Sequence, residues 1–318
     1  MRATPDRAVP AVSVVVPCYR SAATLSTLVE GLHAALASEA SYEIVLVNDS
    51  SPDDTWAAIS RLAAADERVR GIDLLVNHGQ QAATMCGLAH AGGEVVVTMD
   101  DDLQQPPDEV RTLLDALRAD PDLDAVIGTW PRDEGLIRNL GSVFNGWVDR
   151  LANGTPRGLH HTAFRAMQRP VVDTVVANGT RTPILWALVG RSAGRLRNVA
   201  VRHDARPEGR SGFTLREGSR LVLATLFLGT TLPLRLLSLL GAASAFLSLV
   251  AALVFTARWA TGVATPPGWV SSFLAVMFFG GATLLGVGLI GEYLGLVMRE
   301  VREPPRWAIR RTTSTAAE

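Results

Sequence analysis

Apolar runs of strand length alternate with helix-like segments through the first part of the chain. Four mainly apolar segments predict strands: Val12–Pro17, Tyr42–Val47, Gly71–Val76 and Gly93–Met99. The first is an unbroken apolar run, as expected of a strand that is covered on both faces. The segments between them predict helices at Ala22–Leu36, Trp56–Ala65 and Ala82–Ala91. Ser21 is placed to cap the first of these helices. This βαβ alternation predicts an α/β fold with a mostly parallel sheet and right-handed crossovers.

The last third of the chain has a different pattern. Leu236–Ala257 and Gly268–Gly291 contain no charged residue, and each is long enough for a bilayer span, which needs about 20 apolar residues. A pair of buried core helices is the alternative, but core helices usually keep a polar face. Phe213–Leu234 places Arg216 and Arg220 among apolar residues, which is typical of an amphipathic helix at a membrane interface. An ordinary surface helix is the alternative for that segment.

These patterns divide the chain into five parts. They are a disordered N-terminus (1–11), an α/β domain (12–212), amphipathic juxtamembrane helices (213–234), a two-helix transmembrane domain (235–298, spans about 236–257 and 268–291) and a tail (299–318). The N-terminus lacks the apolar core of a signal peptide. The tail carries five Arg, and the positive-inside tendency places it in the cytoplasm. We expect a multi-pass protein of the inner, cytoplasmic membrane with its α/β domain and C-terminus in the cytoplasm.

Composition removes several classes of function. The net charge of -1 gives no reason to expect a nucleic-acid partner. Cys18 and Cys86 are too few for a disulfide framework and lack metal-ligand spacing. No G-x-G-x-x-G follows the first strand and no P-loop occurs, which argues against a Rossmann dinucleotide site and a P-loop nucleotide site.

Polar side chains follow all four predicted strands, where an open α/β sheet binds its ligands. The fourth strand ends in Asp100, Asp101 and Asp102. In an extended segment Asp100 and Asp102 would point to one side and Asp101 to the other. Two such carboxylates suit Mg²⁺ or Mn²⁺, with Gln104 as a further ligand directly or through water. The alternative is an acidic turn that caps the next helix.

Several segments, in this order and spacing, resemble a known family. They read "VSVVVPCYRSAATL", "YEIVLVNDSSPDDT", "NHGQQAATMCGLAHAGGEVVVTMDDDLQQPPDEV", "RPEGRSGF", "LPLR" and "GLIGEYLGLVMREVREPP". The chain resembles glycosyltransferase family 2, of the polyprenyl-phosphate type that is like dolichol-phosphate-mannose synthase. The resemblance implies a nucleotide-diphospho-sugar transferase (GT-A, Rossmann-like) domain followed by two C-terminal transmembrane helices.

The resemblance also implies roles for individual residues. The nucleotide pocket would be lined by Pro17, Tyr19, Asp49, Ser51, Gln80, Asp100 and Asp101, with Asp49 reading the base. Asp100, Asp102 and Gln104 would hold the metal against the donor diphosphate. The acceptor phosphate would meet Arg138 and Ser142 of "IRNLGS", and Arg206 and Arg210 would close over the phosphates. Arginine suits these roles because its planar fork donates paired, charge-assisted hydrogen bonds.

Two positions depart from the family pattern. Many relatives carry an Arg shortly after the strand that here reads "AVIGTWP"; in this chain either Arg132 makes that contact or the contact is absent. Relatives also often carry an Asp, a favoured general base, where this chain has Leu159. His160 or His161 would serve instead, or the two would line the acceptor site or only pack. The candidate catalytic residues are therefore Asp102, Arg138, His160 and His161.

The expected function is inverting, metal-dependent transfer of one sugar, with UDP as the default nucleotide, to polyprenyl phosphate (undecaprenyl or decaprenyl) at the cytoplasmic leaflet. The product would be a polyprenyl-monophosphate sugar of the bacterial cell envelope. Gly291 and Gly295 form a small-xxx-small pair, which leads to the hypothesis of a homo-oligomer. The alternatives are a processive synthase of the same family, a catalytically dead membrane scaffold, and an ion-transport component. The missing Q-x-x-R-W signature argues against the synthase, and the intact Asp100/Asp102 pair argues against the scaffold. The lack of an intramembrane charge pair argues against ion transport.

Overall fold

The structure is a computed structural model. It describes residues 9–130, 159–178, 184–204 and 307–313, together with scattered positions between 239 and 297. The chain divides into two compact units. One comprises Met1–Leu140, Thr155–Gly212 and Glu303–Glu318, and the other comprises Gly141–Gly154 and Phe213–Arg302. Everything below concerns described residues of the first unit unless stated otherwise.

The first unit is built on one eight-stranded sheet with the strand order β7-β5-β6-β4-β1-β2-β3-β8. The strands are β1 (Val12–Cys18), β2 (Tyr42–Asn48), β3 (Val69–Leu74), β4 (Val95–Thr98), β5 (Ala125–Thr129), β6 (Arg165–Gln168), β7 (Leu196–Ala200) and β8 (Ile309–Thr312). Neighbouring strands are parallel in the pairs β1–β2, β1–β4, β2–β3 and β5–β7. Strand β6 runs antiparallel to β4 and β5, and β8 runs antiparallel to β3. The prediction of a mostly parallel α/β sheet is therefore confirmed.

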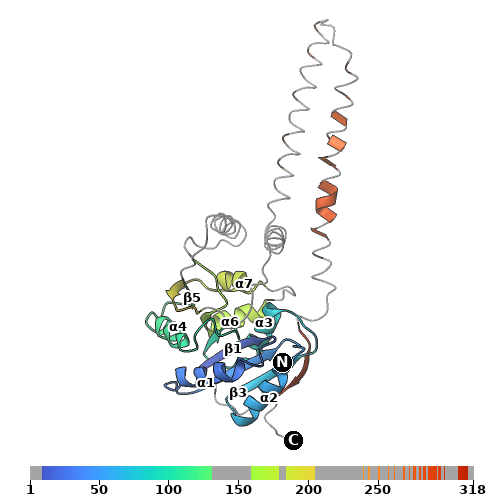
Figure 1. The fold of residues 1–318 in the computed structure, drawn as a ribbon. Coiled ribbons are helices and arrows are strands. Elements are labelled where there is room, and N and C mark those ends of the chain that lie inside the picture. Colours follow the sequence, from blue (N-terminus) through green and yellow to red (C-terminus); the bar gives the residue numbers. More distant parts are fainter. Residues whose placement is uncertain are drawn as a thin grey trace. The chain divides into compact units, whose positions relative to one another are not determined.

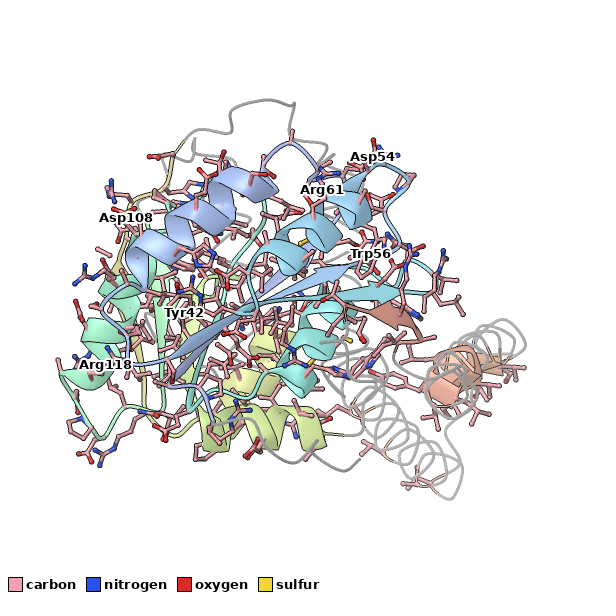
Figure 2. The ribbon with its side chains drawn as sticks, turned by 90° about the horizontal axis from the view of Figure 1, so that it is seen from below. Tyr42, Asp54, Trp56, Arg61, Asp108 and Arg118 are labelled. Atoms are coloured by element: carbon pink, nitrogen blue, oxygen red, sulfur yellow. The ribbon has the colours of Figure 1, made fainter. Side chains whose placement is uncertain are left out.

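Six helices cover the two faces of this sheet. They are α1 (Leu25–Ala35), α2 (Thr55–Ala65), α3 (Gln80–His90), α4 (Glu109–Arg118), α6 (Arg169–Ala177) and α7 (Leu185–Ser192). Side chains on β1 alternate between the faces: Val14 and Val16 pack with α1, α2 and α4, while Val15 packs with α3, α6 and α7. Figure 2 shows α1 and α2 side by side on one face, with Trp56 and Arg61 labelled on α2. A strand buried on both faces explains why β1 reads as an unbroken apolar run.

Several predicted element bounds are wrong. Helix α1 begins at Leu25 with Thr24 as its N-cap, so Ser21 is not the N-cap. The hydroxyl of Thr24 instead donates a hydrogen bond to the carbonyl oxygen of Asp101 at 2.8 Å, which ties the start of α1 to the three aspartates. Strand β3 spans Val69–Leu74, because the apolar residues after it leave the sheet and are exposed.

Strand β8 was not predicted, since this segment was assigned to the tail. It pairs with β3, and Figure 1 shows it in dark red at that edge of the sheet. Arg311 Nε donates to Asp73 Oδ2 at 2.9 Å, and its guanidinium lies 4.8 Å from the ring centroid of Trp56. These contacts cover an otherwise open edge of the sheet.

Among the described residues, the structure contains no helix that is both long enough and apolar enough to cross a membrane. The predicted spans at 236–257 and 268–291, and the amphipathic segment at 213–234, lie almost entirely outside the described residues. These segments, the domain bounds and the topology derived from them stay predictions.

Candidate functional site

The carboxyl ends of β1, β2, β3 and β4 surround a pocket of about 420 Å³. Seven predicted site residues line it: Pro17, Tyr19, Asp49, Gln80, Asp100, Asp101 and Asp102. Cys18, Asn77 and Gly79 line it too and were not predicted as site residues. The structure thus brings together residues that lie more than 80 positions apart in the sequence. We call this the donor pocket.

Asp49 shapes one wall of the donor pocket. It is 3% exposed, and its carboxylate accepts hydrogen bonds from the backbone amides of His78 and Gly79, both at 2.8 Å. Gly79 has a φ of +83°, which favours glycine, and the next residue is Gln80, the first of α3. Asp49 therefore fixes the loop between β3 and α3. Base reading by Asp49 stays a prediction, and each of its oxygens keeps a second lone pair for a ligand.

Ser51 does not line the donor pocket but joins two of its loops. Its hydroxyl oxygen accepts a hydrogen bond from the amide of Arg20 at 2.8 Å, and its hydroxyl donates to Asp53 Oδ1 at 2.5 Å. The loop after β1 is thereby bound to the loop after β2. The predicted contact of Ser51 with nucleotide remains untested.

Backbone strain gathers around the donor pocket. In the described part of the chain, three non-glycine residues have a positive φ: Arg20 (58°), Ser50 (51°) and Leu103 (60°). They lie in the segments that follow β1, β2 and β4. Such conformations cost free energy and cluster at functional sites, where the surrounding structure enforces them.

Hydrogen bonds orient the three aspartates. Strand β4 ends at Thr98, so strand alternation does not orient them as predicted, and all three line the donor pocket. Asp101 Oδ2 accepts from the amide of Tyr19 at 3.0 Å. Asp100 accepts from Gln80 Nε2 at 2.5 Å and from Gln105 Nε2 at 3.0 Å.

Gln105 was missed by the sequence analysis. It is 3% exposed, and its side-chain oxygen also accepts from the backbone amide of Asp100 at 3.0 Å. Gln104, the predicted further metal ligand, does not line the donor pocket. Its amide donates to Asp102 Oδ1 at 3.2 Å, and its role as a metal ligand stays a prediction. Gln104 and Gln105 are adjacent and of the same type, so the sequence carries no signal that separates a metal ligand from a residue that holds Asp100.

The carboxylates of the donor pocket repel one another. The pKa of Asp100 is raised to about 6: burial is the largest cause, the charges of Asp102 and Asp101 add to it, and the Gln105 hydrogen bond and the charge of Arg165 oppose it. Burial also raises the pKa of Asp101. A bound cation would relieve this repulsion, so the residues fit a hard divalent ion.

The donor set of such an ion would be incomplete without substrate. No group of three or more His, Cys, Asp or Glu that could hold a metal ion occurs in the described ranges. Two carboxylates would leave positions for phosphate oxygens and water, which is the usual arrangement for Mg²⁺ with nucleotide substrates.

Most of the predicted acceptor-side residues cannot be compared with the donor pocket, because they lie outside the described residues. These are Arg132, Arg138, Ser142, Arg206 and Arg210. His160 is held by β7, where its amide donates to Asn198 Oδ1 at 2.9 Å. His161 packs on Trp186 of α7 with ring centroids 5.3 Å apart. Neither histidine lines the donor pocket, and their catalytic roles stay predictions.

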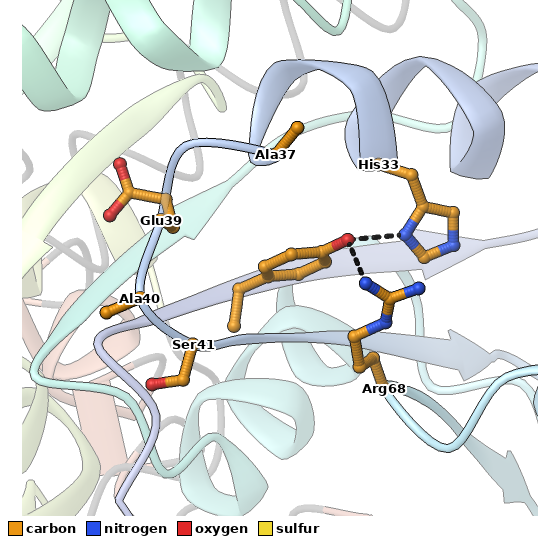
Figure 3. Close-up of a pocket in the computed structure, with 7 residues that line it drawn as sticks. His33, Ala37, Glu39, Ala40, Ser41 and Arg68 are labelled. Carbon is orange, nitrogen blue, oxygen red and sulfur yellow. Dashed lines mark hydrogen bonds between the residues drawn. The ribbon is translucent and has the colours of Figure 1, made fainter.

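A second pocket, of about 480 Å³, lies at the opposite end of the strands (Figure 3). Tyr42 begins β2 there, and its hydroxyl forms hydrogen bonds with His33 Nδ1 at 2.9 Å and Arg68 Nη1 at 2.8 Å. Because ligands of open parallel sheets bind at the carboxyl ends of strands, we assign the chemistry to the smaller donor pocket.

The family model "Glycosyl transferase family 2" matches residues 13–170. A protein named undecaprenyl-phosphate 4-deoxy-4-formamido-L-arabinose transferase in Salmonella gallinarum is 33% identical over 305 residues, covering 94% of this chain and 92% of that protein. The protein of the same name in Sodalis glossinidius is 31% identical over 303 residues, covering 94% and 93%.

Solved structures show the same fold. Glucosyl-3-phosphoglycerate synthase from Mycobacterium tuberculosis, in complex with Mn²⁺, uridine diphosphate and phosphoglyceric acid, superimposes with a TM-score of 0.51 at 21% identity. The match covers 69% of this chain and 78% of that one. This match shows the fold, and the relatives that match over nearly their whole length show the family. The chain therefore belongs to glycosyltransferase family 2, among its polyprenyl-phosphate glycosyltransferases.

Proposed function

We propose that this glycosyltransferase moves a single sugar from a nucleotide-diphosphate sugar, by default a UDP-sugar, to polyprenyl phosphate at the cytoplasmic face of the membrane. The observation that carries the proposal is the donor pocket, which three aspartates line together with the loop that Asp49 fixes. The acceptor class is supported by the printed name of the relatives, which act on undecaprenyl phosphate and match over nearly their whole length.

The reaction is a single displacement. An oxygen of the acceptor phosphate attacks the anomeric carbon, the bond from that carbon to the diphosphate oxygen breaks, and the nucleoside diphosphate leaves with the electron pair. Attack opposite the leaving group inverts the anomeric centre. A strong general base is unnecessary, since the second pKa of a phosphate monoester is about 6 and the attacking group is largely ionised at neutral pH.

The chain's own residues would divide the work. Asp100 and Asp102 would hold a divalent ion, Mg²⁺ or Mn²⁺, beside the donor diphosphate, and Gln104 would complete the set. Such an ion supplies charge stabilisation to the departing diphosphate. The loop of His78 and Gly79 would enclose the nucleoside against Asp49. The acceptor phosphate would bind to Arg138, Ser142, Arg206 and Arg210, together with Arg132 or a histidine.

The test uses membranes that contain the full chain, with Mn²⁺ or Mg²⁺, undecaprenyl phosphate and a panel of labelled nucleotide sugars that includes 4-amino and 4-formamido pentoses. We expect label to enter the organic phase from one donor, and EDTA to abolish the transfer. Asp102→Ala should lose transfer by at least about a hundredfold, as expected when charge stabilisation is removed from a transition state.

Asp173→Ala is the matched control, because Asp173 is an exposed aspartate on α6 with only a 3.6 Å contact to Arg169. It should retain wild-type transfer. Label in a growing polymer would instead favour the processive alternative. Absence of both transfer and nucleotide binding in folded protein would favour the scaffold.

A further inference from the structure

Arg165 is a buried arginine that the proposed reaction does not use. It opens β6, lies opposite Thr98 of β4 and is 4% exposed. Its Nε and Nη1 have no hydrogen-bond partner among the described residues. A guanidinium carries five N–H donors, and burying them unsatisfied is costly. Its position in the core therefore calls for an explanation.

Arg165 lines a small cavity behind the donor pocket. The cavity holds about 10 Å³ and is lined by Pro17, Gln80, Thr98, Asp100 and Arg165, among others. Pro17, Gln80 and Asp100 line the donor pocket as well. Asp100 thus stands in the wall between the two spaces, and the cavity has the size of a single water molecule.

The charges around Asp100 are unbalanced without Arg165. Both side chains that donate to its carboxylate are neutral amides, Gln80 and Gln105. The charged neighbours on the donor-pocket side, Asp101 and Asp102, are anions. Arg165 is the cation whose charge acts on Asp100 among the described residues.

A second arginine in the same segment provides the contrast. Arg169, at the start of α6, donates Nε to the carbonyl oxygen of Gly93 at 2.8 Å, and Nη2 reaches the same oxygen. It also contacts Asp173. Arg169 therefore has the backbone partner of a structural arginine, whereas Arg165 lines the cavity beside Asp100 and its Nε and Nη1 have no hydrogen-bond partner among the described residues.

We infer that Arg165 is a positioning residue: through one water in this cavity it holds the carboxylate of Asp100 in the orientation that a divalent ion requires. This inference rests on the proposed function, because it presupposes an ion at Asp100. Groups behind a metal ligand typically change metal affinity by 10- to 100-fold when they are removed. The effect of Arg165 should therefore appear in ion binding itself and not only in turnover.

The test is a Mn²⁺ titration of the full chain in mild detergent, with free Mn²⁺ followed by electron paramagnetic resonance and no nucleotide present. We expect Arg165→Met to raise the Kd for Mn²⁺ by about tenfold or more. Arg165→Lys keeps the charge and should stay within about threefold of wild type. Arg169→Met is the matched control and should lower the Tm while leaving the Kd unchanged.

Equal Mn²⁺ affinity of folded Arg165→Met and wild type would overturn the inference and leave the proposed function standing. A wild-type chain that binds no Mn²⁺ would overturn the metal site and the inference together.

A second measurement applies if Arg165→Met folds poorly. Thermal unfolding of the metal-free Asp100→Asn, Arg165→Gln and Asp100→Asn/Arg165→Gln variants forms a double-mutant cycle, since glutamine removes the charge of Arg165. We expect the two substitutions to be non-additive, with Arg165→Gln lowering the Tm less in the Asp100→Asn background than in wild type. Strict additivity would show that Arg165 serves the fold independently of Asp100 and would overturn the inference.

Discussion

The backbone amide of Ala308 donates a hydrogen bond to Nε2 of His78 at 3.3 Å. This bond joins the segment before β8 to the loop whose amides hold Asp49 in the donor pocket. Leu75 is bound in the same way, since its amide donates to the carbonyl oxygen of Ala308 at 2.7 Å. The end of the chain therefore supports the donor pocket from the sheet edge.

Loss of this contact should weaken nucleotide binding. His78→Ala removes one neutral hydrogen bond, which contributes about 0.5–1.5 kcal/mol, so the Kd for UDP should rise roughly two- to tenfold. Removing residues 307–318 should have a larger effect and also lower the Tm, because the edge of β3 becomes exposed. Isothermal titration with UDP measures the Kd of both variants, and thermal unfolding measures the Tm. His33→Ala is the control, since His33 bonds Tyr42 at the opposite end of the strands, and an equal loss there would contradict the prediction.

Substitutions of the adjacent residues Asp100 and Asp101 should affect different steps, namely Mn²⁺ binding and donor binding. Asp101 holds the Tyr19 amide, and a hydrogen bond to a charged group contributes about 1.5–3 kcal/mol. Asp101→Ala should therefore raise the KM for the donor by about tenfold or more, with the Kd for Mn²⁺ within about threefold of wild type. Asp100→Ala should mainly weaken Mn²⁺ binding. Asp108→Ala is a control, because Asp108 pairs with Arg202 and does not line the donor pocket. Loss of Mn²⁺ affinity in Asp101→Ala would contradict this division.

Stability of the metal-free protein should depend on the ionisation of Asp100. Its pKa rises to about 6 in the folded state from an ordinary value near 4. The folded state therefore binds more protons than the unfolded state between these values, and the contribution of Asp100 to stability falls as pH rises from 4 to 6. The cost reaches up to roughly 3 kcal/mol above pH 6.

Asp100→Asn removes this titration. The difference in free energy of unfolding between Asp100→Asn and wild type should therefore increase in favour of the variant across this pH range. Urea unfolding at a series of pH values measures it. A difference that stays constant with pH would show that Asp100 is not perturbed in the folded protein.

Close packing between α3 and the sheet should make one glycine intolerant of substitution. A Cβ on Gly87 would lie 2.3 Å from Val15 Cγ1 and 3.2 Å from Val47 Cγ2. Gly87→Ala should therefore cost about 1–3 kcal/mol by overpacking. Gly190→Ala in α7 is the matched control, because its Cβ would come no closer than 4.0 Å to the nearest side chain, His161. It should be neutral or stabilise by up to about 1 kcal/mol. Equal unfolding midpoints for the two variants would contradict the packing.

Some elements of the fold follow directly from local pattern. Strands β1 and β2 end within one residue of their predicted bounds, because both are buried on two faces and so consist mainly of apolar residues. Strand β3 was displaced by two residues, since Leu75 and Val76 are apolar yet 49% and 52% exposed. Strand β8 has four exposed residues, Ile-Arg-Arg-Thr, and no strand pattern at all. It is defined by its partner β3 and by the Arg311–Asp73 contact.

The sequence by itself determined the mostly parallel α/β class, and it predicted that Asp49 and Asp100–Asp102 would come together at the strand ends, where they line one pocket. Each of these depends on periodicity or on residue types next to a strand, which are local properties. The tertiary structure alone decided that Gln105 and Gln80 hold Asp100, that His78 meets Ala308, and that Arg165 lies behind Asp100. Apart from the Gln105–Asp100 contact within the loop after β4, these contacts join residues from different strands and loops. Their formation depends on sheet order and register, which side-chain packing across the whole domain sets and no short stretch of sequence encodes.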